Sequence, residues 1–316
     1  MKKILIVGAG GQIGSELVTY LRGLYGNGNV VAADLRQSER LAADGPFEIL
    51  DALDAERYAE LVRKYGIDSI FNLAALLSAK GEANPTLAWK INIGALTNSL
   101  EVARQYNCAL FTPSSIGAFG GDFPRDNTPQ DTIMQPNTMY GVCKVTGELL
   151  SNYYHTRFGV DTRSVRFPGI ISNVTLPGGG TTDYAVEIYY AAVKGERFVC
   201  PVSSNVYMDM MYMPDALRAT VELMEADPAK LKHRNSFNIA SMSFTPEIIY
   251  AEIRKRLPEF EMVYDVDPVK EAIAESWPNK LDDTCAREEW GWKPEWDLSR
   301  MTDDMLAHIR AKLGAE

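Results

Sequence analysis

The feature that most constrains this sequence is a glycine-rich stretch directly after a short apolar run near its start. Residues 4–7 read I-L-I-V, and the stretch G-A-G-G-Q-I-G follows at 8–14. A continuous apolar run is typical of a strand covered on both faces of a parallel sheet. Glycines at this spacing permit a tight turn, close approach to a pyrophosphate and close helix–strand packing. The pattern predicts a strand–loop–helix unit that binds a dinucleotide through Gly8, Gly11, Gln12, Ile13 and Gly14.

Strand and helix patterns alternate through the first half of the chain. Apolar runs predict further strands at 30–33, 47–50, 69–73, 109–112 and 161–167. Apolar residues at helical spacing predict helices at 12–24, 55–65, 87–106 and 137–158. Strand–helix alternation with right-handed crossovers gives a doubly wound parallel sheet. The expected fold class is therefore α/β and Rossmann-like.

The alternation breaks down after about residue 170, where prolines and glycines cluster. Helical patterns follow at 184–194, 214–225 and 246–257, and the run 237–240 predicts a strand that returns to the main sheet. We expect a dinucleotide-binding domain at 1–170, with a returning segment near 205–240. Residues 171–316 are expected to form a smaller mixed α/β lobe for the substrate.

An acidic residue after the second predicted strand strengthens the dinucleotide interpretation. Asp34 lies about 20 residues beyond the glycine loop, where a carboxylate accepts hydrogen bonds from the adenosine ribose and repels a 2′-phosphate. Arg36 could instead bind a 2′-phosphate, but Asp34 favours NAD over NADP.

Two further segments are expected near the cofactor. Asp51 and Ala52 follow the third predicted strand. Asp51 could reach the adenine edge, or it could simply be a helix N-terminal acid or part of a solvated turn. Small residues after the fourth strand suit a backbone that passes a flat cofactor, although they also pack well. These residues are Leu73, Ala74 and Ala75.

A tyrosine and a lysine four positions apart indicate acid–base chemistry. Tyr140 and Lys144 would share one face of a helix, where the ammonium favours the phenolate form of the tyrosine. The spacing alone is also common for a surface tyrosine and a solvated lysine. Ser115 strengthens the interpretation, because it ends the fifth predicted strand at the edge where open sheets bind ligands. Asn92 could anchor a water molecule or the backbone of the active site.

Composition excludes several classes of function. The chain is 46% hydrophobic and 23% charged, which is typical of a globular protein, and its net charge of −10 disfavours nucleic-acid binding. No apolar run is long enough to span a membrane, and the first apolar run is too short for a signal peptide, so a cytoplasmic protein is expected. No metal site is expected, because three histidines and four cysteines are scattered without ligand spacing. The cysteines, expected to be reduced, are Cys108, Cys143, Cys200 and Cys285.

Together these elements resemble the extended short-chain dehydrogenase/reductase family. The matching motifs include N-L-A-A at 72–75, N-I-G-A-L-T-N at 92–98 and S-S-I-G-A-F-G at 114–120. The resemblance implies that Ser115 orients a substrate hydroxyl, Tyr140 is the acid/base, and Lys144 binds the nicotinamide ribose. It also implies that the backbone around Ile170 passes the nicotinamide amide. A homodimer built from the helices expected at 87–106 and 137–158 is a further implication.

The second half resembles one branch of that family, the short-chain type of L-threonine 3-dehydrogenase. The matching segments are T-P-S-S-I-G-A-F-G at 112–120 and, in the second half, R-F-P-G-I-I-S at 166–172, P-G-G-G-T-T-D-Y-A-V-E-I-Y at 177–189, M-M-Y-M-P-D-A at 210–216 and the tail from S-W-P at 276–278 to W-D-L at 296–298. The implied reaction is NAD-dependent oxidation of L-threonine to 2-amino-3-ketobutyrate. A 2-amino-3-ketobutyrate CoA ligase that consumes the product is an implied functional partner.

The amino acid needs a site for its carboxylate. Thr181 and Thr182 hydroxyls, with the amides of Gly179 and Gly180, offer neutral donors, and Ser78 could add another or lie in water. Asp183 could face the ammonium group or interact with a helix dipole.

Two other functions remain open at this point. A nucleotide-sugar 4-epimerase or dehydratase would use the same serine, tyrosine and lysine, but it needs cations for a diphosphate, and the second half has few suitable arginines. A non-catalytic dinucleotide-sensing protein would not need all three reactive residues.

Overall fold

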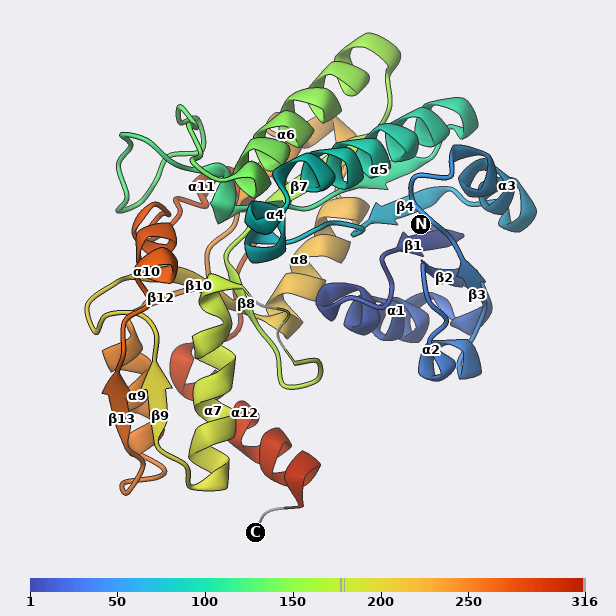
Figure 1. Ribbon diagram of the computed structural model, residues 1–316. Coiled ribbons are helices and arrows are strands. Elements are labelled where there is room, and N and C mark those ends of the chain that lie inside the picture. The colour runs from blue at the N-terminus through green and yellow to red at the C-terminus, as the bar shows by residue number, and fades with distance from the viewer. Residues whose placement is uncertain (177, 179, 315–316) are drawn as a thin grey trace.

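A computed structural model describes residues 1–176, 178 and 180–314. Its largest sheet is parallel throughout, with the strand order β11-β7-β5-β4-β1-β2-β3 and the short β6 beside β7 (Figure 1). The doubly wound Rossmann-like sheet is therefore confirmed. Its strands are β1 (Ile4–Val7), β2 (Val30–Asp34), β3 (Phe47–Ile49), β4 (Ser69–Asn72), β5 (Ala109–Phe111), β6 (Ser114–Ser115), β7 (Thr162–Phe167) and β11 (Asn235–Asn238).

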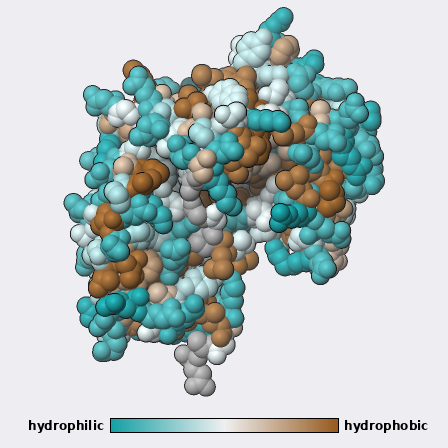
Figure 2. Space-filling view, in the orientation of Figure 1, coloured by the Kyte–Doolittle hydropathy of each residue, from teal (hydrophilic) through white to brown (hydrophobic). Residues whose placement is uncertain are grey.

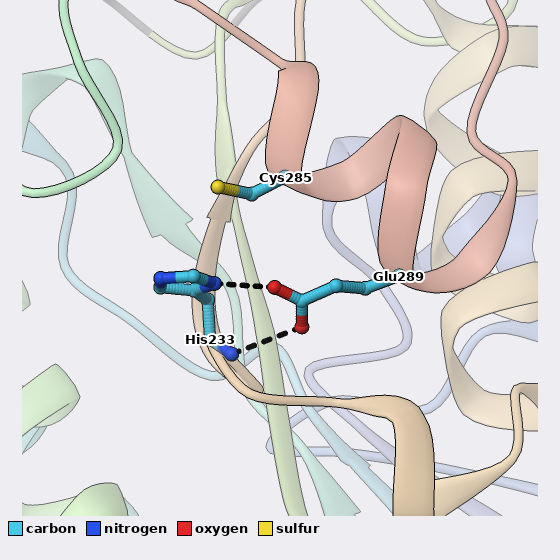
Figure 3. Close-up of side chains that lie close together, drawn as sticks. All are labelled: His233, Cys285 and Glu289. Atoms are coloured by element: carbon cyan, nitrogen blue, oxygen red, sulfur yellow. Dashed lines mark hydrogen bonds and ion pairs between the residues drawn. The ribbon is translucent and has the colours of Figure 1, made fainter.

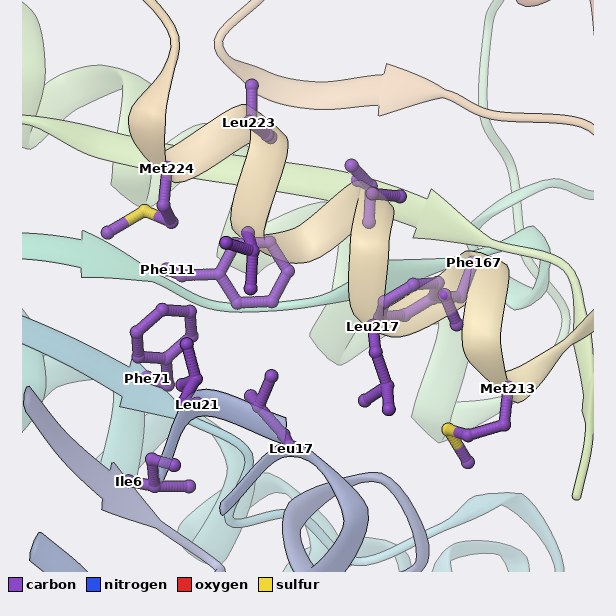
Figure 4. Close-up of a cluster of buried hydrophobic side chains, with 14 of the residues drawn as sticks. Ile6, Leu17, Leu21, Phe71, Phe111, Phe167, Met213, Leu217, Leu223 and Met224 are labelled. Carbon is purple, nitrogen blue, oxygen red and sulfur yellow. The ribbon is translucent and has the colours of Figure 1, made fainter. Parts of the chain in front are cut away.

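Helices cover both faces of this sheet, which explains why the side chains of β1, β4 and β7 are buried without alternation (Figure 1). In β1, Ile4 and Ile6 pack into one core, whereas Leu5 and Val7 pack into another. Figure 4 shows the first core between the sheet and the helices α1 and α8. The covering helices are α1 (Gln12–Tyr25), α2 (Glu39–Ala43), α3 (Ala55–Tyr65), α5 (Pro85–Tyr106), α6 (Met139–Phe158) and α8 (Met213–Glu225).

The rest of the chain builds a smaller region around two short sheets. β10 (Met208–Tyr212) pairs in parallel with β8 (Gly169–Ile171) and antiparallel with β12 (Met242–Phe244). β9 (Phe198–Cys200) and β13 (Met262–Tyr264) pair in parallel. Helices pack around them in a separate hydrophobic core. These helices are α7 (Tyr184–Lys194), α9 (Pro246–Arg254), α10 (Pro268–Glu275) and α12 (Leu298–Leu313). Two helices lie elsewhere: α4 (Ser78–Ala83) packs against α5 and α6, and α11 (Thr284–Trp290) packs against β11 of the main sheet.

The segment 205–240 divides between these two parts. β11 joins the main sheet beside β7, as the sequence predicts, and α8 packs against the same sheet. β10, which begins the segment, belongs instead to the smaller sheet. The returning segment therefore starts at α8.

Local signals explain where several elements begin. Thr245 accepts a hydrogen bond from the Ile248 amide and Pro246 opens α9, as the predicted helix start requires. Thr138 caps α6 in the same way through the amide of Gly141. Among the described residues, no helix has the length and apolar character that crossing a membrane requires.

Candidate active site

The glycine loop between β1 and α1 has a backbone path that side chains would block. Gly8 has φ +82°, and a Cβ atom there would lie 2.7 Å from the amide nitrogen of Ala74. A Cβ on Gly14 would lie 2.2 Å from the carbonyl oxygen of Gly8. A Cβ at either position would therefore displace the loop backbone. The loop thus presents bare backbone amides at the start of α1, as pyrophosphate binding requires.

Asp34 is fixed at the end of β2 by backbone amides. Its two carboxylate oxygens accept hydrogen bonds from the amides of Gly10 and Leu35, each at 2.8 Å. A carboxylate oxygen can accept more than one hydrogen bond, so these contacts leave capacity for a ribose diol. Arg36 is exposed two residues further on.

The adenine-side residues predicted from the sequence have other contacts as well. Asp51 is exposed and accepts a hydrogen bond from the amide of Leu53, the local turn that the simpler interpretation anticipates. Ala52 is buried, and its carbonyl accepts a hydrogen bond from Asn98. Contact of either residue with adenine stays a prediction.

A cavity of about 250 Å³ runs from the glycine loop into the smaller region. It brings together fifteen of the residues predicted from the sequence. Those residues are Gly8, Gly11, Gln12, Ile13, Gly14, Leu73, Ala75, Ser78, Ser115, Tyr140, Lys144, Ile170, Gly180, Thr181 and Thr182. The continuity of this cavity would let a cofactor on the glycine loop meet a small substrate beside Thr181 and Thr182.

The tyrosine and the lysine on α6 are held close to each other. The Lys144 ammonium lies 5.2 Å from the centre of the Tyr140 ring and donates a hydrogen bond of 2.6 Å to the carbonyl of Pro113. The lysine is thus positioned by the loop after β5 while its charge faces the tyrosine.

Ser115 reaches the same point through Gly117. The Ser115 hydroxyl accepts a hydrogen bond of 3.0 Å from the Gly117 amide. A Cβ on Gly117 would lie 3.1 Å from the Tyr140 ring and 3.4 Å from the Ser115 hydroxyl oxygen. Gly117 therefore lets the serine and the tyrosine face one another with no side chain between them.

A buried ion pair supports this arrangement from behind. Arg166 and Glu148 are each 5% exposed or less, and two guanidinium nitrogens donate to the two carboxylate oxygens at 2.9 and 2.8 Å. Glu148 also accepts a hydrogen bond from Ser114, the neighbour of Ser115. The pair thereby connects α6, β7 and β6, the short strand that carries Ser115.

Asn92 holds the backbone beside the site. Its carbonyl oxygen accepts from the Leu76 amide at 2.7 Å, and its amide nitrogen donates to the Leu76 carbonyl at 3.1 Å. Of the two roles expected for Asn92, the structure shows the backbone anchor. Asn92 and Ala74 line a small cavity next to the main one, together with Lys144 and Cys143, whose thiol pKa is raised by burial.

Of the groups predicted to bind the substrate carboxylate, the threonine hydroxyls remain candidates for that role and the Gly180 amide does not. The Gly180 amide already donates a hydrogen bond of 2.6 Å to the Asp183 carboxylate, so the expectation that this amide faces the substrate is not met. Asp183 thus stabilises the turn that starts α7, the simpler of its two expected roles. Thr181 and Thr182 remain as donors at the cavity, and Gly179 lies outside the described residues.

Some residues of the cavity wall were not predicted from the sequence. Trp277, Ile116 and Leu77 line the cavity with the predicted residues, and Trp277 is only 7% exposed. Trp277 follows α10, far along the chain from the other residues. In the sequence, only the S-W-P motif at 276–278 pointed to Trp277.

Comparison with known proteins agrees with this geometry. A model of the NAD dependent epimerase/dehydratase family matches residues 4–240. An uncharacterized epimerase/dehydratase of Staphylococcus aureus (strain MRSA252) is 57% identical over 314 residues, which cover 99% of this chain and 98% of that protein. The chain therefore belongs to the NAD dependent epimerase/dehydratase family, within the extended short-chain dehydrogenases/reductases, and it binds NAD.

Comparison with solved structures identifies a more specific group of similar proteins. L-threonine dehydrogenase from Clostridium difficile superposes with a TM-score of 0.97 at 55% identity, covering 99% of this chain and 98% of that one. The holo form of a GalE-like L-threonine dehydrogenase from Cupriavidus necator gives a TM-score of 0.95 at 50% identity, covering 97% and 99%. The chain is thus an NAD-dependent enzyme that resembles L-threonine 3-dehydrogenases.

Proposed function

We propose that this protein is an NAD-dependent L-threonine 3-dehydrogenase that oxidises the β-hydroxyl of L-threonine to give 2-amino-3-ketobutyrate. The observation that carries the proposal is the single cavity in which Ser115, Tyr140 and Lys144 face Thr181 and Thr182. The similarity to L-threonine dehydrogenases over nearly the whole chain supports it.

In this proposal Tyr140 is the general base. Its phenolate takes the proton of the substrate hydroxyl while the hydrogen on Cβ leaves with its electron pair. NAD⁺ supplies the acceptor for that electron pair. The reaction balances as L-threonine and NAD⁺ giving 2-amino-3-ketobutyrate, NADH and one proton.

Ser115 and Lys144 have supporting roles. The Ser115 hydroxyl is directed at the Tyr140 side of the cavity and orients the substrate alcohol. Lys144, held by the Pro113 carbonyl at 2.6 Å, stabilises the negative charge on Tyr140 and binds the nicotinamide ribose. Both groups are preorganised, so little reorganisation is needed as charge develops.

The other end of the substrate is assigned to the smaller region. Thr181 and Thr182 donate hydrogen bonds to the substrate carboxylate, and Ser78, buried at the cavity wall, adds a third hydroxyl. Trp277 and Ile116 close the cavity around the substrate methyl group and limit the space available. A nucleotide sugar would need a longer and more cationic site than this wall provides.

The test is a panel of substrates with NAD⁺ and the purified protein. L-threonine should produce NADH fastest, followed by L-serine and L-allo-threonine, with 3-hydroxybutyrate and a UDP-sugar giving none. Conversion of a UDP-sugar without net NADH, and no NADH from L-threonine, would replace the proposal with a nucleotide-sugar epimerase. Tight NAD binding with no turnover of any compound would indicate a dinucleotide sensor.

We infer that two copies associate through α5 and α6. These helices expose large apolar side chains, with Trp89 at 43%, Leu149 at 64% and Tyr153 at 55%, and Figure 2 shows hydrophobic residues over them. Leu149→Glu should halve the mass measured by sedimentation. Val269→Glu, at an equally exposed site on α10, should not, and equal behaviour of the two variants would reject the interface.

A further inference from the structure

A cluster of potential metal ligands lies between α11 and the loop that precedes β11. It consists of His233, Cys285 and Glu289, and one donor atom from each lies within 4.8 Å of the others (Figure 3). Cys285 and Glu289 are four residues apart on α11, so they project from the same face of the helix. His233 approaches that face from a part of the chain about fifty residues earlier. No role in the proposed reaction accounts for this cluster.

The hydrogen bonds of Glu289 leave one carboxylate oxygen for the cluster. One oxygen accepts the backbone amides of Lys232 and His233, at 2.5 and 3.2 Å. The other contacts only the Nδ1 atom of His233 among the contacts of the described residues (Figure 3). A cation can therefore bind between this oxygen and Nδ1 without disturbing the backbone contacts.

The surroundings favour a cation and provide a way in. The Nε2 atom of His233 lies 3.7 Å from a carboxylate oxygen of Asp131, and a carboxylate behind a ligating histidine fixes its orientation. His233 and Asp131 also line an open groove on the surface. The Cys285 thiol is half-buried rather than enclosed.

We propose that His233, Cys285 and Glu289 bind one transition-metal ion of the zinc class. Thiolate, imidazole and carboxylate together suit Zn²⁺, whereas Mg²⁺ and Ca²⁺ prefer oxygen ligands alone. In a tetrahedral site these donor atoms lie about 3–4 Å apart, so small side-chain rotations suffice. Water completes the coordination. Binding releases the thiol proton, because the thiolate is the form that binds metal.

The ion braces α11 against β11 and is structural. The three ligands come from two segments that no disulfide joins, since Cys285 is a free thiol. A shared ligand set links these segments and stabilises the folded state by mass action. The proposal departs from the sequence-based expectation of no metal site, which rested on the spacing of single residues along the chain.

Cobalt spectroscopy tests the proposal. Metal-stripped protein titrated with Co²⁺ should bind one equivalent with a sulfur-to-cobalt charge-transfer band, and Zn²⁺ should displace it. Cys285→Ser should lose the band, and Glu289→Gln should weaken binding by about tenfold or more. Glu288→Gln makes the same charge change on the neighbouring residue and should leave binding unchanged. Each variant is first checked for wild-type NAD binding.

Thermal unfolding tests the proposal by a measurement that is independent of the cobalt spectrum. Zn²⁺ should raise the Tm of the wild type and of Glu288→Gln by about a few degrees, and should leave Cys285→Ser unchanged. Absence of the charge-transfer band in the wild type would overturn the proposal. Survival of that band in Cys285→Ser would overturn it equally.

Discussion

The two glycine-rich segments of this chain, at 8–14 and around 178–180, have different roles in the site. In the first, Cβ atoms on Gly8 and Gly14 would lie 2.7 and 2.2 Å from backbone atoms, so glycine itself is required. In the second, a Cβ on Gly178 would meet nothing closer than a Leu77 methyl at 3.7 Å, and Gly180 would meet only the Asp183 side chain. The first segment contributes its backbone to the site, whereas the second contributes the threonine hydroxyls that follow it.

The largest effect is expected at Tyr140, which lies between the two segments. Tyr140→Phe removes the general base and should lower kcat by about 10²- to 10⁴-fold, because proton transfer contributes that much to such reactions. NAD affinity should change little. Steady-state kinetics with L-threonine and NAD titration check the two effects separately. Tyr207→Phe, 43% exposed and outside the cavity lining, is the control; near wild-type turnover of Tyr140→Phe would remove Tyr140 from the mechanism.

Gly14→Ala tests the steric requirement of the first segment. The added methyl must displace the Gly8 carbonyl, so NAD affinity should fall by about a hundredfold or more, as loss of several phosphate contacts implies. Isothermal titration with NAD measures this loss. Gly178→Ala, in the second segment, should bind NAD within about twofold of the wild type, since its methyl comes no closer than 3.7 Å, an ordinary van der Waals contact with Leu77. Equal losses in the two variants would erase the distinction between the segments.

Thr182→Ala tests the contribution of the second segment. Loss of one hydrogen bond to a charged carboxylate costs about 1.5–3 kcal/mol, so KM for L-threonine should rise by about tenfold or more while kcat and NAD affinity hold. Thr175→Ala serves as control, because the Thr175 hydroxyl contacts Ser15 outside the cavity. A change confined to kcat would contradict the assignment of Thr182 to the carboxylate.

Two buried acidic residues, one in each part of the molecule, differ in their expected effect on stability. In the nucleotide-binding half, Glu148 is paired with Arg166. In the smaller sheet, Asp209 is fully buried, and one of its carboxylate oxygens accepts a hydrogen bond from the Leu281 amide. Burial raises the pKa of Asp209 well above its ordinary value.

The raised pKa fixes the sign of the pH dependence. The folded protein holds this proton more tightly than the unfolded chain, so the contribution to stability is complete below the ordinary Asp pKa of about 4. It is lost as the pH rises through the folded-state pKa. Asp209→Asn should therefore gain Tm relative to the wild type, by about a few degrees, as the pH rises from acidic to neutral. Thermal melts across that range check it, and a constant difference would show that Asp209 titrates normally.

The nucleotide-binding half was predictable because its signals are local. The strand, glycine loop and helix at 4–25 follow one another in sequence, and Tyr140 and Lys144 lie about one helical turn apart on α6. The smaller sheet was not found, because β8 and β12 have three residues each and show no periodicity.

Contacts between distant segments account for the remaining gaps in the site. Trp277 enters the cavity from a loop far from Tyr140 in sequence, and the pairing of Glu148 with Arg166 joins a helix to a strand. The Gly180 amide looked available in the sequence, but Asp183 three residues later takes it up. Such partners are decided by packing, which a single sequence does not display.

The most direct measurement follows one hydrogen atom. L-threonine carrying deuterium on Cβ is oxidised by the wild-type protein with NAD⁺, and the molecular mass of the NADH formed is measured by mass spectrometry. Oxidation at the β-hydroxyl predicts NADH one mass unit heavier than that from ordinary L-threonine, together with a slower rate where C–H cleavage limits turnover. NADH of ordinary mass, or no NADH at all, would contradict the central claim that this cavity oxidises L-threonine at Cβ.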